Sequence, residues 1–497
     1  MIDFSNQTPR AKREKQKTAA QVEAEAVDFS EVEFEEIELE VTKTRGSAKA
    51  GSKISDAMAV AIAFFLFIAP IPYGAHRALA WSSFAVLLAV MALFYVVAMA
   101  LVDPDRPSQV RKIRSVLVPG LLFIAVAALQ LVPISFGDLG GLLPETLVPN
   151  SLTLSQSATG FGILRLCSYA ILFVLVTEVC TNRMRTERLT KLVFWGVLVH
   201  ALWSLVSLSF LDDTLLFAQK AHYEGFATGT FVNRNSFATY LGMGMVIGVA
   251  QLTYMVYAPK PRSPRRRTGS RTISMDAVVQ FMLVSIIVLA LVSTGSRLGL
   301  LSGIVGSVLV AIAIMVKSDV KIKVKAAFGL AAGAVLLLVL ALSGSLLSDR
   351  LAFALVDAET RIELYRQTMD MIWQRPWFGY GLDSYSIAFE IFHSPELKTS
   401  LTWEMPHNTY LTLWSELGLI GGSLPLIAIA IAFWAMVRNL WLRERSFVPA
   451  ASGAAVVVVV ALHSFGDFSL EIAANVYLFV AIVALGMARR AHLREDK

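Results

Sequence analysis

A histidine at the start of an apolar segment is the residue of this sequence best suited to acid–base chemistry. His407 follows Pro406 and precedes Asn408 at the beginning of a long hydrophobic run. An imidazole at the edge of a bilayer could act as a general base near neutral pH, with Asn408 orienting its ring or a substrate hydroxyl. The same pair also fits an interfacial histidine followed by a helix-capping asparagine. The sequence leaves both interpretations open.

Two arginines at the starts of other apolar segments could bind phosphate. Arg234 lies in the string FVNRNS, directly after Asn233, and Arg297 ends the string STGSR. A guanidinium binds phosphate through paired planar donors, and the neighbouring Asn, Ser and Gly residues offer further donors. Two such sites at one membrane depth suit a diphosphate. The alternative is that each arginine reaches out to lipid phosphates.

A third group of polar and aromatic residues precedes His407. Apolar side chains from Ile362 to Trp373 recur at helical spacing, which predicts an amphipathic helix over 360–374 lying on the membrane. Arg361 begins that helix. Arg165 is a weaker member of the arginine set, and no role is assigned to Asp467 or Glu471. No Cys/His cluster has metal-ligand spacing and no glycine-rich nucleotide loop occurs, so neither a metal nor a cofactor is expected.

The elements that position these residues are predicted to be transmembrane helices. The chain has 497 residues, of which 56% are hydrophobic and 16% charged, whereas soluble domains carry about 25% charged residues. Since about 20 apolar residues span a bilayer, the fold class is all-α and polytopic, with about twelve spans. They are predicted at 56–73, 79–102, 115–134, 162–180, 192–211, 234–257, 276–294, 298–316, 326–347, 406–437, 449–466 and 470–488.

Basic residues predict the orientation of these helices. With the N-terminus inside, 34 of the 44 Lys and Arg fall in the cytoplasmic segments, as the positive-inside rule requires. The basic charge therefore directs topology and gives no support to nucleic-acid binding. The helices are expected in a bacterial inner membrane, with both termini in the cytoplasm. The loop at 348–405, with its amphipathic helices between the ninth and tenth spans, is expected on the periplasmic face.

The expected domain organisation follows from these segments. Residues 1–55 form a charged cytoplasmic tail, 56–347 carry spans one to nine, 406–490 carry spans ten to twelve, and 491–497 form a second tail. Acidic and apolar residues alternate over 32–41, which could dock as a strand on a cytoplasmic partner. A disordered tail is favoured because this segment has little apolar surface to bury. Gly418, Gly421, Gly422 and Pro425 mark where the long tenth span could kink.

Four motifs in order resemble the O-antigen ligase and polymerase superfamily. They are GTFVNRN at 229–235, STGSRLG at 293–299, Arg361 with Pro376 and Gly-Tyr-Gly at 379–381, and His407-Asn408 with ELGLIG at 416–421. The resemblance covers about 225–425, slightly under half of the chain. The charged N-terminal tail is a departure from the family pattern.

This resemblance implies a metal-independent, inverting glycosyltransferase that uses a polyprenyl-diphosphate-linked glycan as donor. By the motifs, Arg234 and Arg297 would hold the donor diphosphate and Arg361 would assist donor or acceptor binding. His407 would deprotonate the acceptor hydroxyl. The acceptor would be lipid A–core for a ligase, or another lipid-linked glycan for a polymerase. The sequence does not decide between the two.

A transporter or flippase for lipid-linked oligosaccharide is the alternative class. Transporters often show two similar halves and ionisable residues at mid-membrane. Here the two halves differ, and the polar residues gather at one membrane boundary. The sequence therefore favours an enzyme.

Overall fold

The computed structural model describes residues 31–135, 137, 148–216, 218–257, 274–318, 321, 323–325, 350–397, 402–442 and 447–488. The chain divides into two compact units. The smaller unit consists of Met1–Ile54 and Val97–Arg106, and the larger of Ser55–Val96 and Pro107–Lys497. All of the predicted site residues belong to the larger unit.

The fold is all-α and polytopic. Within the described ranges, nine helices are long and apolar enough to cross a membrane, and two shorter apolar helices follow them. The long helices are α2 (Glu31–Ile68, apolar from Gly46), α3 (Ala78–Val102), α4 (Val110–Leu129), α5 (Gln156–Val179), α6 (Arg183–Phe210), α7 (Arg234–Tyr257), α8 (Met275–Ser293), α9 (Arg297–Val316) and α13 (Thr409–Leu442). The two shorter ones are α14 (Val448–His463) and α15 (Ala473–Met487).

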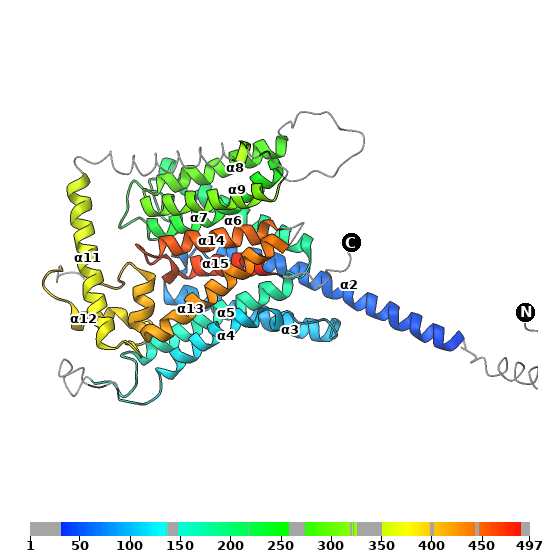
Figure 1. Ribbon diagram of the computed structural model, residues 1–497, viewed down its shortest axis with the longest axis horizontal. Helices are drawn as coiled ribbons and strands as arrows, with labels where there is room; N and C mark the ends of the chain where they lie inside the picture. Colours follow the sequence, from blue (N-terminus) through cyan, green and yellow to red (C-terminus); the bar gives the residue numbers. More distant parts are fainter. Residues whose placement is uncertain are drawn as a thin grey trace, which may run out of the picture. The chain divides into compact units, whose positions relative to one another are not determined.

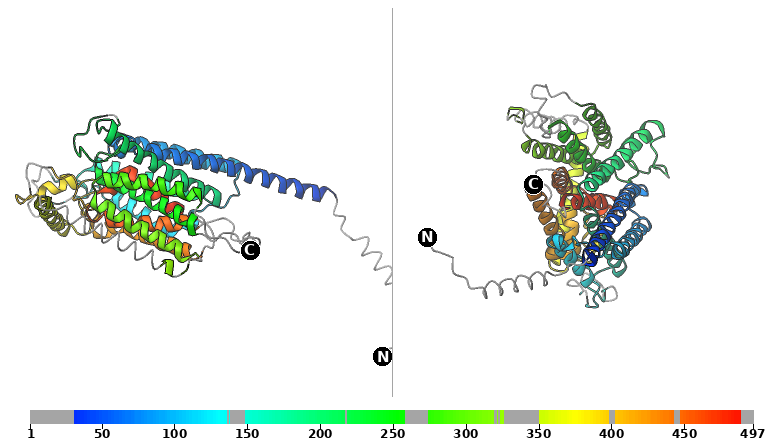
Figure 2. Two further views of the ribbon diagram at one scale, coloured as in Figure 1. Left: turned by 90° about the horizontal axis from the view of Figure 1, so that it is seen from above. Right: turned by 90° about the vertical axis from the view of Figure 1, so that its right-hand side faces the viewer.

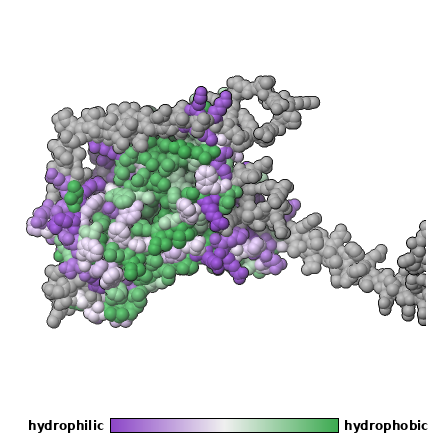
Figure 3. All heavy atoms as spheres, viewed as in Figure 1, coloured by the Kyte–Doolittle hydropathy of each residue, from purple (hydrophilic) through white to green (hydrophobic). Residues whose placement is uncertain are grey.

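Eleven of the twelve predicted spans coincide with these helices. The ninth predicted span, 326–347, lies outside the described residues. Figure 3 shows apolar side chains covering the middle of the helix bundle, with hydrophilic ones at the end that carries α11 (Arg350–Gln374) and α12 (Tyr385–Phe392). Exposed leucine, valine and phenylalanine side chains on these helices are what a lipid-facing surface requires.

Part of the N-terminal tail is helical, where a disordered tail was favoured. Helix α2 begins at Glu31 and runs without a break into its apolar part. Glutamate, lysine, alanine and leucine are good helix formers, and an adjoining transmembrane helix removes the cost of nucleation. Residues 1–30 are outside the described ranges. At its other end α2 stops at Ile68, before Pro70 and Pro72, which disfavour helix in the residues that precede them.

Helices α14 and α15 form a central layer of the larger unit. Helix α14 packs on α7 and α9 on one side, whereas α13 packs on α14 and α15 packs on α5. Helix α4 completes the second side by packing on α13 and α5. Figure 1 shows this order, with α7 and α9 above the α14–α15 pair and α13, α5 and α4 below it.

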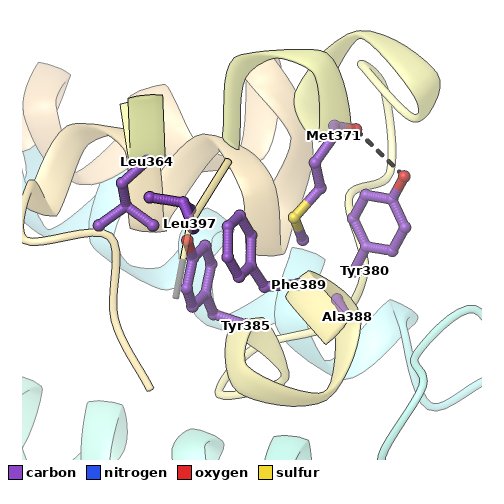
Figure 4. Packing of buried hydrophobic residues seen from close by; sticks show 7 residues of the cluster. All are labelled: Leu364, Met371, Tyr380, Tyr385, Ala388, Phe389 and Leu397. Carbon is purple, nitrogen blue, oxygen red and sulfur yellow. Dashed lines mark hydrogen bonds between the residues drawn. The ribbon is translucent and has the colours of Figure 1, made fainter. Parts of the chain in front are cut away.

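Helices α11 and α12 cross one end of the bundle and have a small core of their own (Figures 1 and 2). The core consists of seven buried residues, drawn in Figure 4: Leu364, Met371, Tyr380, Tyr385, Ala388, Phe389 and Leu397. The helix predicted over 360–374 is present within α11, and Ile362 and Trp373 of its predicted apolar stripe are exposed. Its position on the membrane stays a prediction. Another face, with Leu364, Thr368 and Met371, is buried because the helix packs on α12 and on the following loop.

The segment after α11 is attached to a kink in α13. Gly418 interrupts α13 with φ +71° and ψ 171°, so the predicted break occurs at this glycine. The freed backbone groups pair with the Gly-Tyr-Gly loop: Tyr380 N–H donates to Ser415 O at 3.0 Å, and Gly381 N–H to Glu416 O at 2.9 Å. Gln130 of the α4 C-terminus donates to the carbonyls of Phe378 and Glu416, both at 2.8 Å.

Candidate active site

The turn between α14 and α15, residues 464–472, receives side chains from α11 and α13. Arg361 Nη1 donates to Gly466 O at 2.8 Å. The Tyr365 hydroxyl contacts Phe465 O at 3.2 Å and His407 O at 3.1 Å. Burial raises the pKa of Tyr365, which keeps this donor protonated. The turn therefore places Arg361 beside the His407 segment.

His407 lies two residues before the start of α13, in a strained conformation. Its φ is +55°, in the left-handed region that is uncommon for residues with a side chain. Its ring packs edge-on against Phe468 of the α14–α15 turn, with 4.9 Å between ring centroids. The side chain is half-buried. A residue in this conformation must be held there by its surroundings, here by Phe468 and by Tyr365, which donates to its carbonyl.

Both predicted site asparagines have structural partners at helix N-termini. Asn408 Oδ1 accepts from the N–H groups of Tyr410 and Leu411 at 3.0 and 3.2 Å, and its amide donates to Phe465 O at 3.1 Å. Asn233 Oδ1 accepts from Asn235 N–H at 2.7 Å at the start of α7. These contacts make each of them a helix cap. They hold His407 and Arg234 at the ends of rigid helices.

Arg234 begins α7 beneath an aromatic loop. Its guanidinium lies 4.3 Å from the ring centroid of Phe226 and 5.5 Å from that of Tyr223, a cation–π arrangement. A Cβ on Gly295 would lie 3.1 Å from Arg234 Nη1 and 2.6 Å from the Phe226 ring. Gly295, with φ +63°, thus lets the α8–α9 turn approach Arg234.

Arg297 begins α9 directly after that turn and is exposed. The neighbouring Leu298 packs on Gly466, where an added Cβ would lie 2.9 Å from Leu298 Cδ2. Gly466 is also the residue whose carbonyl accepts from Arg361. Four predicted site residues therefore lie at the same end of the bundle, namely Arg234, Arg297, Arg361 and His407.

Asp467 is a residue of this site that the sequence did not identify. It is 1% exposed, and Oδ2 accepts a short hydrogen bond from Ser469 and lies 3.7 Å from His463 Nδ1. The Asn235 amide lies 3.5 Å from Oδ1, and the Thr409 hydroxyl lies 3.5 Å from the backbone carbonyl. Asp467 thus joins the start of α7 to the start of α13. Its only sequence signal is a carboxylate between two short apolar segments.

Arg165 of α5 has contacts that differ from those of the other arginines. It forms an ion pair with Asp383 at 2.5 Å, and it lines a cavity together with Glu416 and Glu471. Glu416 is 5% exposed, and Oε1 accepts from Tyr385 N–H at 3.3 Å. Arg165 thus has an acidic partner of its own and shares the cavity wall with Glu471 of the α14–α15 turn. In the described part of the chain, no three His, Cys, Asp or Glu residues are grouped as metal ligands would be.

A comparison with protein families matches the segment that contains several of these residues. Residues 281–426 match the family model described as O-antigen ligase. This match, which covers less than a third of the chain, supports membership of the O-antigen ligase and polymerase superfamily. No curated protein shows significant similarity to it. The O-antigen ligase match begins within α8 and ends within α13, so it contains Arg297, Arg361 and His407. Arg234 and Asp467 lie outside the matched segment, and the fold brings them to it.

Proposed function

We propose that this protein transfers a glycan from a polyprenyl-diphosphate carrier to an acceptor hydroxyl on the periplasmic face of the inner membrane. The main support is that the α14–α15 turn contacts Arg361, the His407 ring and the start of α9, which carries Arg297, while Arg234 approaches the α8–α9 turn before it. An O-antigen ligase match covers two of those arginines and the histidine. Both a ligase that acts on lipid A–core and a polymerase that extends lipid-linked glycan fit this site.

In the proposed reaction, His407 takes the proton of the acceptor hydroxyl as its oxygen attacks the anomeric carbon. The new C–O bond forms while the bond from that carbon to the diphosphate breaks, which inverts the anomeric configuration. The lipid diphosphate leaves with the bonding electrons. Arg234 and Arg297 stabilise its negative charge through charge-assisted hydrogen bonds, and Arg361 binds donor or acceptor. In this mechanism the arginines neutralise the leaving group, and no metal is required.

The test is a substitution of His407 by a residue that can adopt the same positive φ. Asparagine tolerates positive φ better than most residues, so His407→Asn preserves the fold and removes the base. We expect loss of glycan transfer at least of the size of a general-base effect, about 10²-fold to 10⁴-fold. Lipid-linked donor accumulates on the outer face of the membrane. The rate of glycan transfer is measured directly with purified protein in lipid nanodiscs that contain polyprenyl-diphosphate-linked glycan.

The same variant separates the enzyme from a flippase. Transfer at the wild-type rate by His407→Asn would contradict the mechanism. Donor that stays on the inner face in a deletion strain would favour the flippase. Lipid A–core without polymer, with lipid-linked polymer present, identifies a ligase, whereas loss of polymer itself identifies a polymerase.

A further inference from the structure

A large apolar cavity lies on the side of the α14–α15 layer that faces α4, α5 and α13. Its volume is about 630 Å³, within the roughly 300–1,000 Å³ of ligand-binding sites. Nearly all of its lining is hydrophobic, with Phe123, Phe173 and Phe433 among the larger side chains. Helices α4, α5 and α13 are all candidate membrane spans, so the cavity lies where lipid chains are the surrounding solvent.

One end of the cavity reaches the residues next to His407. Thr409 and Tyr410 of α13, together with Ser464 and Phe465 of the α14–α15 turn, belong to its lining. Thr409 is two residues from His407, and Phe465 accepts the hydrogen bonds of Asn408 and Tyr365. A chain held in the cavity would therefore emerge beside the proposed base.

The cavity and the two diphosphate-binding arginines lie on opposite sides of α14. Val459 of α14 packs toward α7 and α9, since its side chain lies against Gly242 and Gly306. Val457 and Val458, from the same helix, line the cavity. None of the lining residues belongs to α7, α8 or α9. A polyprenyl chain begins at its diphosphate. The chain of a donor held at Arg234 and Arg297 therefore extends along the side of α14 that faces α7 and α9, away from the cavity.

The charges at the polar end of the cavity also disfavour a diphosphate. Arg165 is the cationic side chain of the lining, and it is already paired with Asp383. Glu416 and Glu471 add two carboxyl groups at the same end. A diphosphate would therefore meet acidic groups there, whereas a hydrocarbon chain gains from burial in the apolar part.

We propose that this cavity binds a hydrocarbon chain of the lipid that accepts the glycan, and that this acceptor is not a polyprenyl diphosphate, as in a ligase rather than a polymerase. This inference rests on the proposed function and adds to it that donor and acceptor approach His407 from opposite sides of the α14–α15 layer. The acceptor chain enters among α4, α5 and α13, and its sugar extends past Thr409 toward His407.

Gly120 offers a way to fill the cavity without disturbing its walls. It lines the cavity, and a Cβ added there meets no atom within 4 Å. Gly120→Phe therefore adds a large ring at the cavity wall without a clash at its Cβ. Gly160 of α5 is a matched control, because its Cβ also meets nothing within 4 Å and it does not line the cavity.

The experiment uses the full-length protein in lipid nanodiscs and a dodecyl glycoside with a diazirine at the end of its chain. Light should attach this probe to residues of α4 and α13. We expect Gly120→Phe to weaken this labelling roughly tenfold, the scale on which a pocket rejects added bulk, and Gly160→Phe to retain it. A polyprenyl diphosphate carrying the same diazirine should label α7 or α9 and be insensitive to Gly120→Phe.

Three outcomes would overturn the proposal. Labelling of α4 and α13 that persists in Gly120→Phe means that the cavity is not the chain site. Labelling of the cavity by polyprenyl diphosphate assigns it to the donor. The third outcome is that the cavity is labelled as expected but the protein transfers no glycan in the same nanodiscs. That result overturns the proposed function and, with it, the assignment of the cavity to the acceptor. The cavity would then be a binding site for a lipid chain only.

Discussion

Asp467 is a buried carboxylate, and its burial destabilises the fold unless nearby groups compensate for the lost hydration. Removing a carboxylate from water requires compensation by hydrogen bonds and nearby charge. Asp467 has Ser469 and His463 at one oxygen and Asn235 at the other. The same residue lies one position after Gly466, which binds Arg361, and one before Phe468, which packs on His407. We therefore interpret Asp467 as a positioning residue that aligns the arginines with the histidine.

Asp467→Asn tests this role. The amide keeps the size of the side chain and cannot accept at both oxygen positions, so the turn and Asn235 should shift. We expect kcat for glycan transfer to fall roughly 10²-fold, the scale expected when reacting groups are misplaced by about 1 Å. KM for the donor should change much less. Steady-state kinetics in nanodiscs measures both constants.

Asp467→Glu is the conservative partner of this variant. It restores the carboxylate, so partial recovery of kcat supports a positioning role that depends on charge. Equal loss in both variants, together with a lower unfolding temperature in each, would indicate that Asp467 only stabilises the turn.

The sequence identified the residues at the starts of helices but missed the turn that connects them. Arg234, Arg297 and His407 stand at the borders of apolar runs, where a polar residue is conspicuous. The contacts of Asp467 with residue 235 and of Gly466 with residue 361 join positions more than 100 residues apart. Such contacts depend on how the helices pack, and local patterns do not encode them.

The kink in α13 fixes the α11–α12 segment to the bundle. A Cβ on Gly418 would lie 2.3 Å from Trp377 O, and its φ of +71° disfavours any other residue. Gly379 makes the reciprocal approach, since its Cβ would lie 2.4 Å from Glu416 O. Two glycines thus allow backbone to pack on backbone, and the loop that follows Arg361 and Tyr365 is held against the helix that follows His407.

Gly418→Ala should therefore destabilise this junction. The strained conformation alone costs about 1–3 kcal/mol, and the clash with Trp377 adds to it. We expect a lower unfolding temperature and a comparable loss of glycan transfer, because α11 carries Arg361. Differential scanning fluorimetry in detergent measures the stability.

Gly196→Ala in α6 is the matched control. Its Cβ would meet Phe67 only at 3.9 Å, an ordinary contact, so it should be neutral or slightly stabilising. Equal unfolding temperatures for the two variants would contradict the proposed role of the kink.

Helix positions followed from hydropathy, whereas the packing of α11 did not. A run of about 20 apolar residues needs no partner to be recognised, which explains the agreement of eleven spans with described helices. The buried face of α11 is chosen by its neighbours. Tyr385 hydrogen-bonds to Thr368, and Tyr380 to Met371 O, which draws that face inward and leaves Ile362 and Trp373 exposed. Residue periodicity predicted an apolar face toward the membrane and did not identify the face that packs on α12.

At the scale of the whole molecule, the central α14–α15 layer separates two regions with different chemistry. On one side, α7 and α9 present Arg234 and Arg297. On the other, α4, α5 and α13 enclose an apolar cavity that ends in a pair of carboxyl groups. An enzyme that joins two lipid-linked molecules needs two entrances and one point of contact. The α14–α15 turn, beside His407, is that point in our proposal.

The sidedness of this site can be tested from the number of membrane crossings. Arg188 is exposed near the start of α6, and the side chain of Asp370 on α11 is 60% exposed. The described helices that cross the membrane between these two residues are α6, α7, α8 and α9. The predicted span at 326–347 adds a fifth crossing. Five crossings put the two residues on opposite faces, with Asp370 outside, whereas four would put them on the same face.

Cysteine labelling distinguishes these cases. In right-side-out vesicles we expect a membrane-impermeant maleimide to label Asp370→Cys and not Arg188→Cys, and the reverse in inside-out vesicles. The wild-type chain is the background control, since Cys180 is buried and Cys167 half-buried. Labelling of both variants from the same side would show that residues 326–347 do not cross the membrane. An exchange of the two patterns would invert the topology and place His407 in the cytoplasm, where a periplasmic transferase could not use it.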